Sequence, residues 1–269
     1  MSNIERLFLD VNGVRLCCVD FGGEGAPVLL LHGLAGRANE WRSTARWLSH
    51  RHRVLALDQR GHGMSDKGLP DYSRGAYVDD VIAVIERLGL GPVVLVGQSM
   101  GGLNAFLVAA RRPDLVRALV VVEASPGGPN PQVPERVSAW LDSWPVPFPT
   151  LADAKAFFGG DTLYAQTWLE VLEEHPDGYR PLFRREDMVS SMADTAERDY
   201  WGEWSRVRCS ALVVVGERGF VPQDDVAEMA RRVASARGAL VPGAGHDLHL
   251  EQPHAWRELA DAFLSQVRY

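Results

Sequence analysis

The sequence has no excess of positive charge, no long apolar run and only three cysteines in 269 residues. With 28 Lys and Arg against 35 Asp and Glu, the formal net charge is −7, which gives no electrostatic basis for binding nucleic acid or an anionic membrane. No apolar run approaches the roughly 18 residues of a membrane-spanning helix, and the first residues lack the pattern of a secretory signal. We therefore expect a cytoplasmic protein that contacts neither nucleic acid nor a membrane.

Cofactor signatures are missing as well. Cys17, Cys18 and Cys209 do not suggest a disulfide framework, and we expect them to be small buried side chains. His246 and His249 have the spacing of two zinc ligands, but no third ligand accompanies them in the sequence, so we expect no metal. The glycine-containing turns form neither a dinucleotide-binding motif nor a phosphate loop. We expect no cofactor.

Strand-like and helical patterns alternate along most of the chain. Eight apolar runs lie at residues 7–11, 14–19, 28–31, 54–57, 93–96, 119–122, 211–215 and 239–241, and helical patterns lie at 38–49, 74–88, 100–111, 223–233 and 253–267. From residue 28 onward the apolar runs are mostly unbroken, as strands covered by helices on both faces must be. The pattern predicts an α/β fold with a mostly parallel sheet, preceded by an antiparallel hairpin through Asn12-Gly13.

Residues 126–206 interrupt this alternation. Prolines punctuate the first part of this segment, helical patterns follow at 151–158, 164–174 and 188–204, and no convincing strand is present. We expect a helical cap inserted after the sixth strand, dividing a core domain of residues 1–125 and 207–269. The cap's tryptophans are expected to form mostly its own core, with one or two lining a substrate pocket at the sheet edge: Trp140, Trp144, Trp168, Trp201 and Trp204.

The sequence GQSMG, residues 97–101, lies between an apolar run and a helical pattern, with Ser99 at the apex of the turn. So tight a turn needs small residues on both sides, because a β-carbon at Gly97 or Gly101 would clash. The Ser99 hydroxyl would then stand clear of the sheet, and the Met100 N–H would point toward a developing oxyanion. The pattern predicts a nucleophile elbow with Ser99 as covalent catalyst.

A serine nucleophile needs a base and a second donor for the oxyanion. Among eight histidines, His246 follows the last strand-like run in a loop that leaves the same sheet edge as the Ser99 turn. We predict His246 as the base; the alternative is a helix-capping or surface histidine. The loop after residue 31, with Gly33 and Gly36, lets the backbone approach the site, so the Leu34 N–H is the predicted second donor beside Met100.

Four segments of the chain, in order, resemble the motifs of the α/β-hydrolase superfamily: His32-Gly33, DQRGHGMS at 58–65, GQSMGG at 97–102, and GAGH at 243–246 followed by LEQP at 250–253. The resemblance covers nearly the whole chain and is weakest across residues 126–206, which correspond to the superfamily's variable cap. It implies an α/β-hydrolase fold with Ser/His chemistry and a structural role for segment 58–65. The serine at the elbow differs from the aspartate that haloalkane dehalogenases and epoxide hydrolases carry there.

The resemblance leaves the triad acid open. In the family the acid usually follows the strand that corresponds to 211–215, but here the loop reads GERGFVP and the expected position holds Gly219. A second location in the family is the end of the preceding strand, where this chain has Glu123. We predict Glu123 as the acid, with Glu217 as the alternative.

The complete set of residues predicts hydrolysis of a carboxylic ester, lactone or thioester through an acyl-enzyme, without a cofactor. The expected partner is a small-molecule substrate, an apolar or aromatic acyl compound, whereas the sequence does not indicate an oligomeric state. Two alternatives remain. One is a non-hydrolytic enzyme on the same fold, such as a lyase or haloperoxidase, or a C–C bond hydrolase. The other is a ligand-binding receptor.

Overall fold

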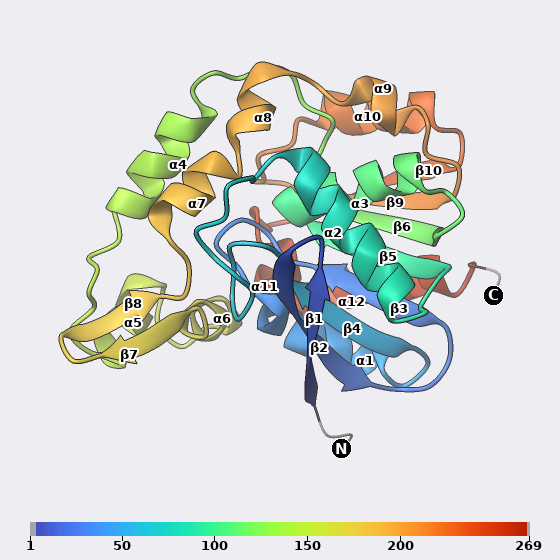
Figure 1. The fold of residues 1–269 in the computed structure, drawn as a ribbon. Helices are drawn as coiled ribbons and strands as arrows, with labels where there is room; N and C mark the ends of the chain where they lie inside the picture. The colour runs from blue at the N-terminus through green and yellow to red at the C-terminus, as the bar shows by residue number, and fades with distance from the viewer. Residues whose placement is uncertain (1–3, 268–269) are drawn as a thin grey trace.

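An eight-stranded sheet organises the computed structural model, which describes residues 4–267 (Figure 1). Its strand order is β1-β2-β4-β3-β5-β6-β9-β10. The bounds are β1 (Glu5–Val11), β2 (Val14–Gly22), β3 (Pro27–Leu31), β4 (Arg53–Asp58), β5 (Val93–Gln98), β6 (Val116–Val122), β9 (Ser210–Gly216) and β10 (Ala236–Val241). The β1/β2 and β2/β4 pairs are antiparallel and the others are parallel, so the predicted mostly parallel sheet is confirmed.

Helices cover both faces of this sheet (Figure 1). Side chains of α2 (Arg74–Arg87), α3 (Met100–Arg111) and α10 (Gln223–Arg232) pack on one face, whereas α1 (Arg42–Leu48) and α12 (Pro253–Leu264) pack on the other. Two short helices, η1 (Ala38–Trp41) and α11 (Leu248–Glu251), precede α1 and α12. Burial on both faces explains why the strands from residue 28 onward are almost continuously apolar.

The hairpin predicted at Asn12-Gly13 is present. Both residues have positive φ, 52° and 76°, as a two-residue turn joining antiparallel strands requires, and Val11 pairs with Val14 across it. Cys17 and Cys18 in β2 are buried, and Cys209 is partly exposed. Within residues 4–267, no helix has the length and apolar character needed to cross a membrane.

The segment 126–206 lies between β6 and β9 and beside the core in Figure 1. Its elements are α4 (Val133–Asp142), α5 (Leu151–Phe157), α6 (Leu163–Leu169), β7 (Leu172–His175), β8 (Gly178–Pro181), α7 (Arg185–Ser190), α8 (Ala193–Glu197) and α9 (Trp201–Trp204). The expectation of an insertion without strands was wrong, because β7 and β8 form an antiparallel hairpin. The hairpin is short and its residues are half-buried or exposed, so it lacks the apolar run that marks the core strands.

The tryptophans of this segment divide between two cores. Trp144 is buried in the segment's own cluster, with Trp168 packed against it. Trp204 instead packs in the main core, where its ring meets Phe106 edge-on and its Nε1–H donates to the Met229 carbonyl at 2.9 Å. Trp168 also packs against a second small cluster, which includes Ala35 next to Leu34.

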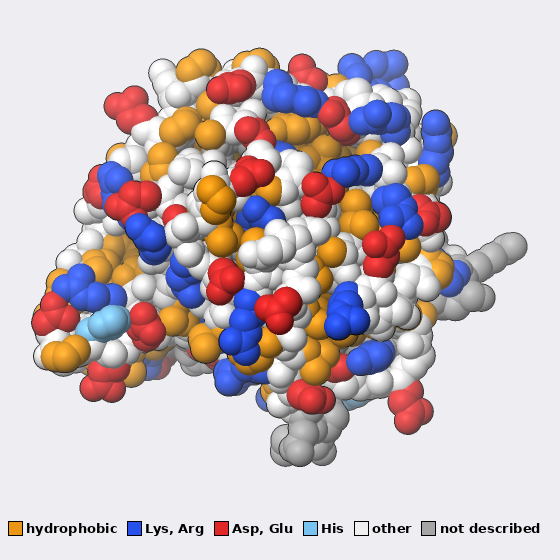
Figure 2. All heavy atoms as spheres, in the orientation of Figure 1, with side chains coloured by type: hydrophobic (Ala, Val, Ile, Leu, Met, Phe, Trp, Pro, Cys, Tyr) orange, Lys and Arg blue, Asp and Glu red, His pale blue; other side chains and the backbone are white. Residues whose placement is uncertain are grey.

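Charged side chains of both signs are interspersed on one face of the molecule. On the face drawn in Figure 2, Lys and Arg alternate with Asp and Glu, and apolar side chains lie between them. Many of the arginines are in ion pairs with neighbouring carboxylates, including Arg185 with Asp142 at 2.6 Å. The face shown therefore gathers neither sign of charge into one large patch.

Candidate active site

Ser99 occupies a strained turn between β5 and α3, with φ 51° and ψ −118°. A β-carbon at Gly97 would overlap the Gly101 carbonyl, and one at Gly101 would overlap the carbonyls of Leu31 and His32. Both glycines are therefore required for close backbone approach, as the sequence pattern predicts. A non-glycine residue with positive φ persists only where the surrounding structure holds it, and such residues cluster at functional sites.

The parallel register places a second such residue beside Ser99. Gln98 and Val122 are partners across the parallel strands β5 and β6. The next residues, Ser99 and Glu123, therefore lie side by side just beyond the carboxyl ends of these strands. The Ser99 N–H donates to the Val122 carbonyl at 2.8 Å, and the Glu123 N–H donates to the Val214 carbonyl at 2.9 Å. Glu123 also has positive φ, 49°.

The Glu123 side chain is fully buried and its carboxylate is held at both oxygens. Oε1 accepts the Gly216 N–H at 2.7 Å, and Oε2 accepts the Phe220 N–H at 2.9 Å. His246 Nδ1 lies 3.2 Å from the same Oε2. A buried carboxylate with two backbone donors and one imidazole partner can orient that imidazole and stabilise its charged form.

The loop after β9, where the family usually has its acid, binds the Glu123 carboxylate here. Gly219 leaves room for the Glu123 carboxylate, because a β-carbon at residue 219 would overlap it. Glu217, the alternative acid, is exposed, and its Oε2 accepts the Gly243 N–H at 2.8 Å. Glu217 thus stabilises the start of the loop that carries His246.

Three further side chains hold the His246 loop, and the sequence pattern did not indicate them. Gln98 Nε2 donates to the His246 carbonyl at 3.1 Å and to Asp247 Oδ1 at 3.2 Å. Glu251 accepts the N–H groups of Gly245 and Asp247 at 2.8 and 3.2 Å. The exposed ring of Phe220 stacks on the imidazole, with centroids 4.5 Å apart and planes 26° apart.

The side-chain amide next to the elbow therefore bonds directly to the loop of the predicted base. Among residues 4–267 no hydrogen bond joins the Ser99 hydroxyl to His246. Catalytic hydrogen bonds are often long in hydrolases until a substrate is bound.

The loop that carries Leu34 lies against the elbow. A β-carbon at Gly33 would overlap Gln98 Oε1 and would lie 3.5 Å from the β-carbon of Ser99. The N–H groups of Leu34 and Met100 have no hydrogen-bond acceptor within the described chain. Unpaired backbone donors beside a serine are what an oxyanion hole requires.

Segment 58–65 forms a buried turn, which agrees with the structural role that the resemblance implies. The Asp58 carboxylate accepts the N–H groups of Ala38 and Met64 at 2.6 and 2.8 Å. Arg60 makes a two-pronged ion pair with buried Asp80, at 2.7 and 2.8 Å. These contacts join the segment to η1 and α2.

A second acid lies behind the Leu34 loop. Glu40 in η1 is buried, and burial raises the pKa of its carboxyl to about 7, although the nearby His32 and His246 oppose this shift. Its Oε1 lies 3.5 Å from His249 Nε2. Burial lowers the pKa of His249 to about 4, and this ring stacks on Trp41. His249 thus faces Glu40 and Trp41, and near pH 6 the contact joins two neutral groups.

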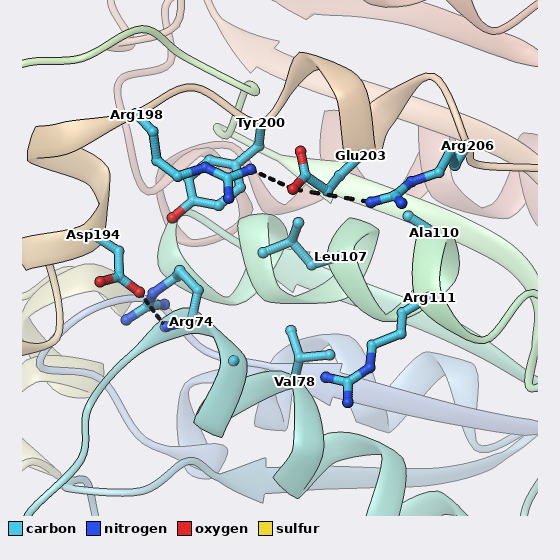
Figure 3. Close-up of a pocket in the computed structure, with 11 residues that line it drawn as sticks. Arg74, Val78, Leu107, Ala110, Arg111, Asp194, Arg198, Tyr200, Glu203 and Arg206 are labelled. Atoms are coloured by element: carbon cyan, nitrogen blue, oxygen red, sulfur yellow. Dashed lines mark hydrogen bonds and ion pairs between the residues drawn. The ribbon is translucent and has the colours of Figure 1, made fainter.

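Figure 3 shows a separate cleft of about 470 Å³ between α2, α3 and the segment that contains α8 and α9. Its described lining includes none of the predicted catalytic residues. Arg198 and Arg206 point toward Glu203, and Arg111 pairs with Asp79 at 2.8 Å. Since these guanidinium groups already have carboxylate partners, the cleft does not present them as a free anion site. Arg74, which also lines the cleft, is almost fully buried.

Comparisons with known proteins agree with this architecture. A family model described as the alpha/beta hydrolase fold matches residues 26–253. The chain is 28% identical over 239 residues to 2-(acetamidomethylene)succinate hydrolase of Mesorhizobium japonicum, covering 86% of this chain and 85% of the relative. It is 30% identical over 244 residues to N-formylmaleamate deformylase of Pseudomonas putida, covering 88% of each. A crystal structure of E-2-(acetamidomethylene)succinate hydrolase superposes with a TM-score of 0.89 at 25% identity, covering 98% of this chain and 100% of that chain.

Proposed function

The chain belongs to the alpha/beta hydrolase fold family, as its motifs predict, and from that premise we propose that it is a serine hydrolase. The proposed reaction is cleavage of a carboxylic ester, lactone or thioester through an acyl-enzyme. One observation carries the proposal: the 3.2 Å contact between His246 Nδ1 and the buried Glu123 carboxylate, at the level where Ser99 leaves the sheet. That contact is the base–acid half of a catalytic triad.

The chemistry follows from these groups. With Nδ1–H donating a hydrogen bond to the Glu123 carboxylate, the Nε2 of His246 is free to accept the Ser99 hydroxyl proton as Oγ attacks the acyl carbon. The N–H groups of Leu34 and Met100 stabilise the oxyanion. Collapse of the tetrahedral intermediate breaks the bond to the leaving group, which takes the proton from His246. Water then attacks the acyl-enzyme, gives a proton to His246, and releases the acid while Ser99 regains its proton.

In this proposal residues 126–206 form a cap over the substrate. Leu141, Met188 and Trp168 from three elements of that segment pack against the loop containing Leu34 and Ala35, so the cap contributes walls next to the oxyanion donors. An apolar acyl group is compatible with these walls.

A second candidate is cleavage of an acyl–nitrogen bond by the same steps. The names of the two relatives, a deformylase acting on N-formylmaleamate and a hydrolase acting on an acetamidomethylene-substituted succinate, favour this candidate. Both names describe small acids, which differ from the apolar or aromatic acyl compound that the sequence predicts.

Labelling with a fluorophosphonate tests the nucleophile. We expect the wild-type protein to be labelled and Ser99→Ala to be unlabelled, while Ser205→Ala, which changes an exposed serine far along the chain, keeps the label. Equal behaviour of the wild type and Ser99→Ala would refute the proposal and favour a ligand-binding receptor. A panel of aryl esters, lactones, thioesters and N-acyl derivatives of small dicarboxylic acids then separates the two hydrolytic candidates from a non-hydrolytic enzyme, which would turn over none of them.

A further inference from the structure

A row of buried polar side chains connects segment 126–206 to the Leu34 loop. Arg74 in α2 donates from one terminal nitrogen to the Ser191 carbonyl at the end of α7, and from the other to Asn104 Oδ1 at 2.8 Å. Asn104 Nδ2 donates to Gln59 Oε1 at 2.7 Å. Gln59 Nε2 donates to the His32 carbonyl at 2.7 Å. All four side chains are almost fully buried: Arg74, Asn104, Gln59 and His32.

A backbone bond beside the row, from Gln59, fixes the tautomer of His32. The Gln59 backbone N–H can only donate, and it donates to His32 Nε2 at 3.0 Å, so Nε2 carries no proton. The proton of the neutral ring is therefore on Nδ1, which lies 2.7 Å from the Gly33 carbonyl and donates to it. Gln59 thus holds His32 through both its side chain and its backbone.

The Gly33 carbonyl belongs to the same peptide unit as the Leu34 N–H. In a trans peptide the C=O and N–H bonds are coplanar and point in opposite directions, so fixing one fixes the other. The His32 imidazole, together with the Gly36 N–H that donates to the same carbonyl at 3.2 Å, therefore sets the direction of the N–H group that the proposed function uses as an oxyanion donor. The His32 carbonyl is also confined on its other side, since a β-carbon at Gly101 would overlap it.

We propose that Asn104 and Gln59 are positioning residues, which link the docking of segment 126–206 on Arg74 to the orientation of the Leu34 N–H. The inference rests on the proposed function for its catalytic consequence, but its structural part stands on the hydrogen bonds alone. When the Ser191 carbonyl at the end of α7 accepts from Arg74, every hydrogen bond of the row is made. The Leu34 N–H is then already oriented for the oxyanion. When α7 moves, Arg74 loses an acceptor and the row loses its hydrogen bond to segment 126–206 (Figure 3 shows Arg74 beside Asp194 of that segment).

Two isosteric variants each remove a different hydrogen bond of the row. Asn104→Asp keeps an acceptor for Arg74 but replaces the donor to Gln59 with an oxygen. Gln59→Glu keeps an acceptor for Asn104 but replaces the donor to the His32 carbonyl with an oxygen. The matched control is Thr44→Val, which removes the buried acceptor of the Trp256 Nε1–H at 2.9 Å on the other face of the sheet.

Two readouts are measured, namely hydrogen exchange of the backbone in residues 33–36 and kinetics with an activated ester. We expect both row variants to exchange about tenfold faster in that segment, and to lose about tenfold in kcat with KM within about twofold, since an oxyanion donor acts mainly on the transition state. Thr44→Val is expected to lower Tm without either change. Arg74→Gln is expected to speed exchange in residues 187–192 as well as 33–36.

The outcomes separate the inference from the proposed function. If the row variants lose only Tm, as the control does, the row is merely structural and the inference is overturned. If exchange in residues 33–36 rises in the row variants while the wild type neither reacts with a fluorophosphonate nor hydrolyses any acyl substrate, the row stands and the proposed function fails. If Arg74→Gln leaves both segments unchanged, the link to segment 126–206 is rejected.

Discussion

Gly219 and Glu123 share one volume: a β-carbon at residue 219 would overlap Oε1, Cδ and Oε2 of the Glu123 carboxylate. The backbone at residue 219 does not have positive φ, so glycine is present for space and not for conformational freedom. The family position of the acid is therefore vacant because a carboxylate from the neighbouring strand fills the same place. The loop retains a function, since the Gly216 and Phe220 N–H groups on either side bind that carboxylate.

We expect Gly219→Ala to reduce kcat/KM by about tenfold or more, because the new methyl group displaces the carboxylate that orients His246 in the proposed mechanism. Gly128→Ala is the matched control, since a β-carbon there meets nothing within 4 Å. In a Glu123→Ala background the added methyl group of Gly219→Ala should cost almost nothing, because the clash is gone. An equal loss in both backgrounds, measured by ester kinetics, would contradict the shared volume.

The same geometry predicts that the acid can be moved. Glu123→Ala combined with Gly219→Asp puts a carboxylate into the vacated volume, from the other strand end. We expect the double variant to recover at least about tenfold in kcat/KM over Glu123→Ala alone, given the large effect of a triad carboxylate. Gly219→Asn in the same background supplies the shape without the charge, and its rescue to the same level would argue against a carboxylate role.

Glu123→Gln and Glu217→Gln distinguish the two acids weighed from the sequence. We expect Glu123→Gln to lower kcat by at least about 100-fold, because an amide cannot stabilise the imidazolium as a carboxylate does. Glu217→Gln should have little effect, because its remaining amide oxygen still accepts the Gly243 N–H. The kinetics of both variants on an activated aryl ester check this ranking, and the reverse order would assign the acid to Glu217.

The sequence predicts the sheet and the elbow well because both depend on local patterns. Unbroken apolar runs indicate strands buried on two faces, and Gly97 and Gly101 mark a turn in which no β-carbon fits. Glu123 was chosen from the family's second acid position, and the structure puts its carboxylate against His246. In each case one short segment carries the necessary information.

The missed features depend on contacts between distant segments. The β7–β8 hairpin has no apolar run, so periodicity does not reveal it. Gln98 and Gln59 look like ordinary polar residues at strand ends, and only the fold brings one to the His246 loop and the other to His32. Glu40 lies in a short 3₁₀ turn, and its burial follows from packing that the sequence does not display.

Phe220 is predicted to restrain the His246 imidazole from the solvent side. We expect Phe220→Ala to lower kcat/KM severalfold, because the imidazole loses the ring stacked on it, while Phe220→Tyr keeps the ring and the activity. The side chain is 75% exposed, so Tm should change little in either variant. Equal kcat/KM for the alanine and tyrosine variants would show that the stacked ring does not restrain the base.

Glu40 is predicted to make stability fall as the pH rises. Burial raises the pKa of its carboxyl from 4.5 to about 7, so between these values the folded protein binds more protons than the unfolded chain. The stabilisation is complete below pH 4.5 and is lost as the pH passes through about 7. His249, whose pKa is lowered from 6.5 to about 4, acts in the opposite direction in the overlapping range, so the wild-type curve alone does not isolate Glu40.

Comparison with Glu40→Gln removes that overlap, because His249 is present in both proteins and only the carboxyl titrates in one. We expect the unfolding free energy of the variant, relative to the wild type, to rise with pH across this window by a few kcal/mol, about 1.4 for each unit of pKa shift. Urea denaturation at about pH 4 and about pH 8 measures the difference. A difference that is the same at both pH values would mean that the Glu40 carboxyl titrates alike in the folded and unfolded chain, and burial behind the Leu34 loop would then not be what controls its charge.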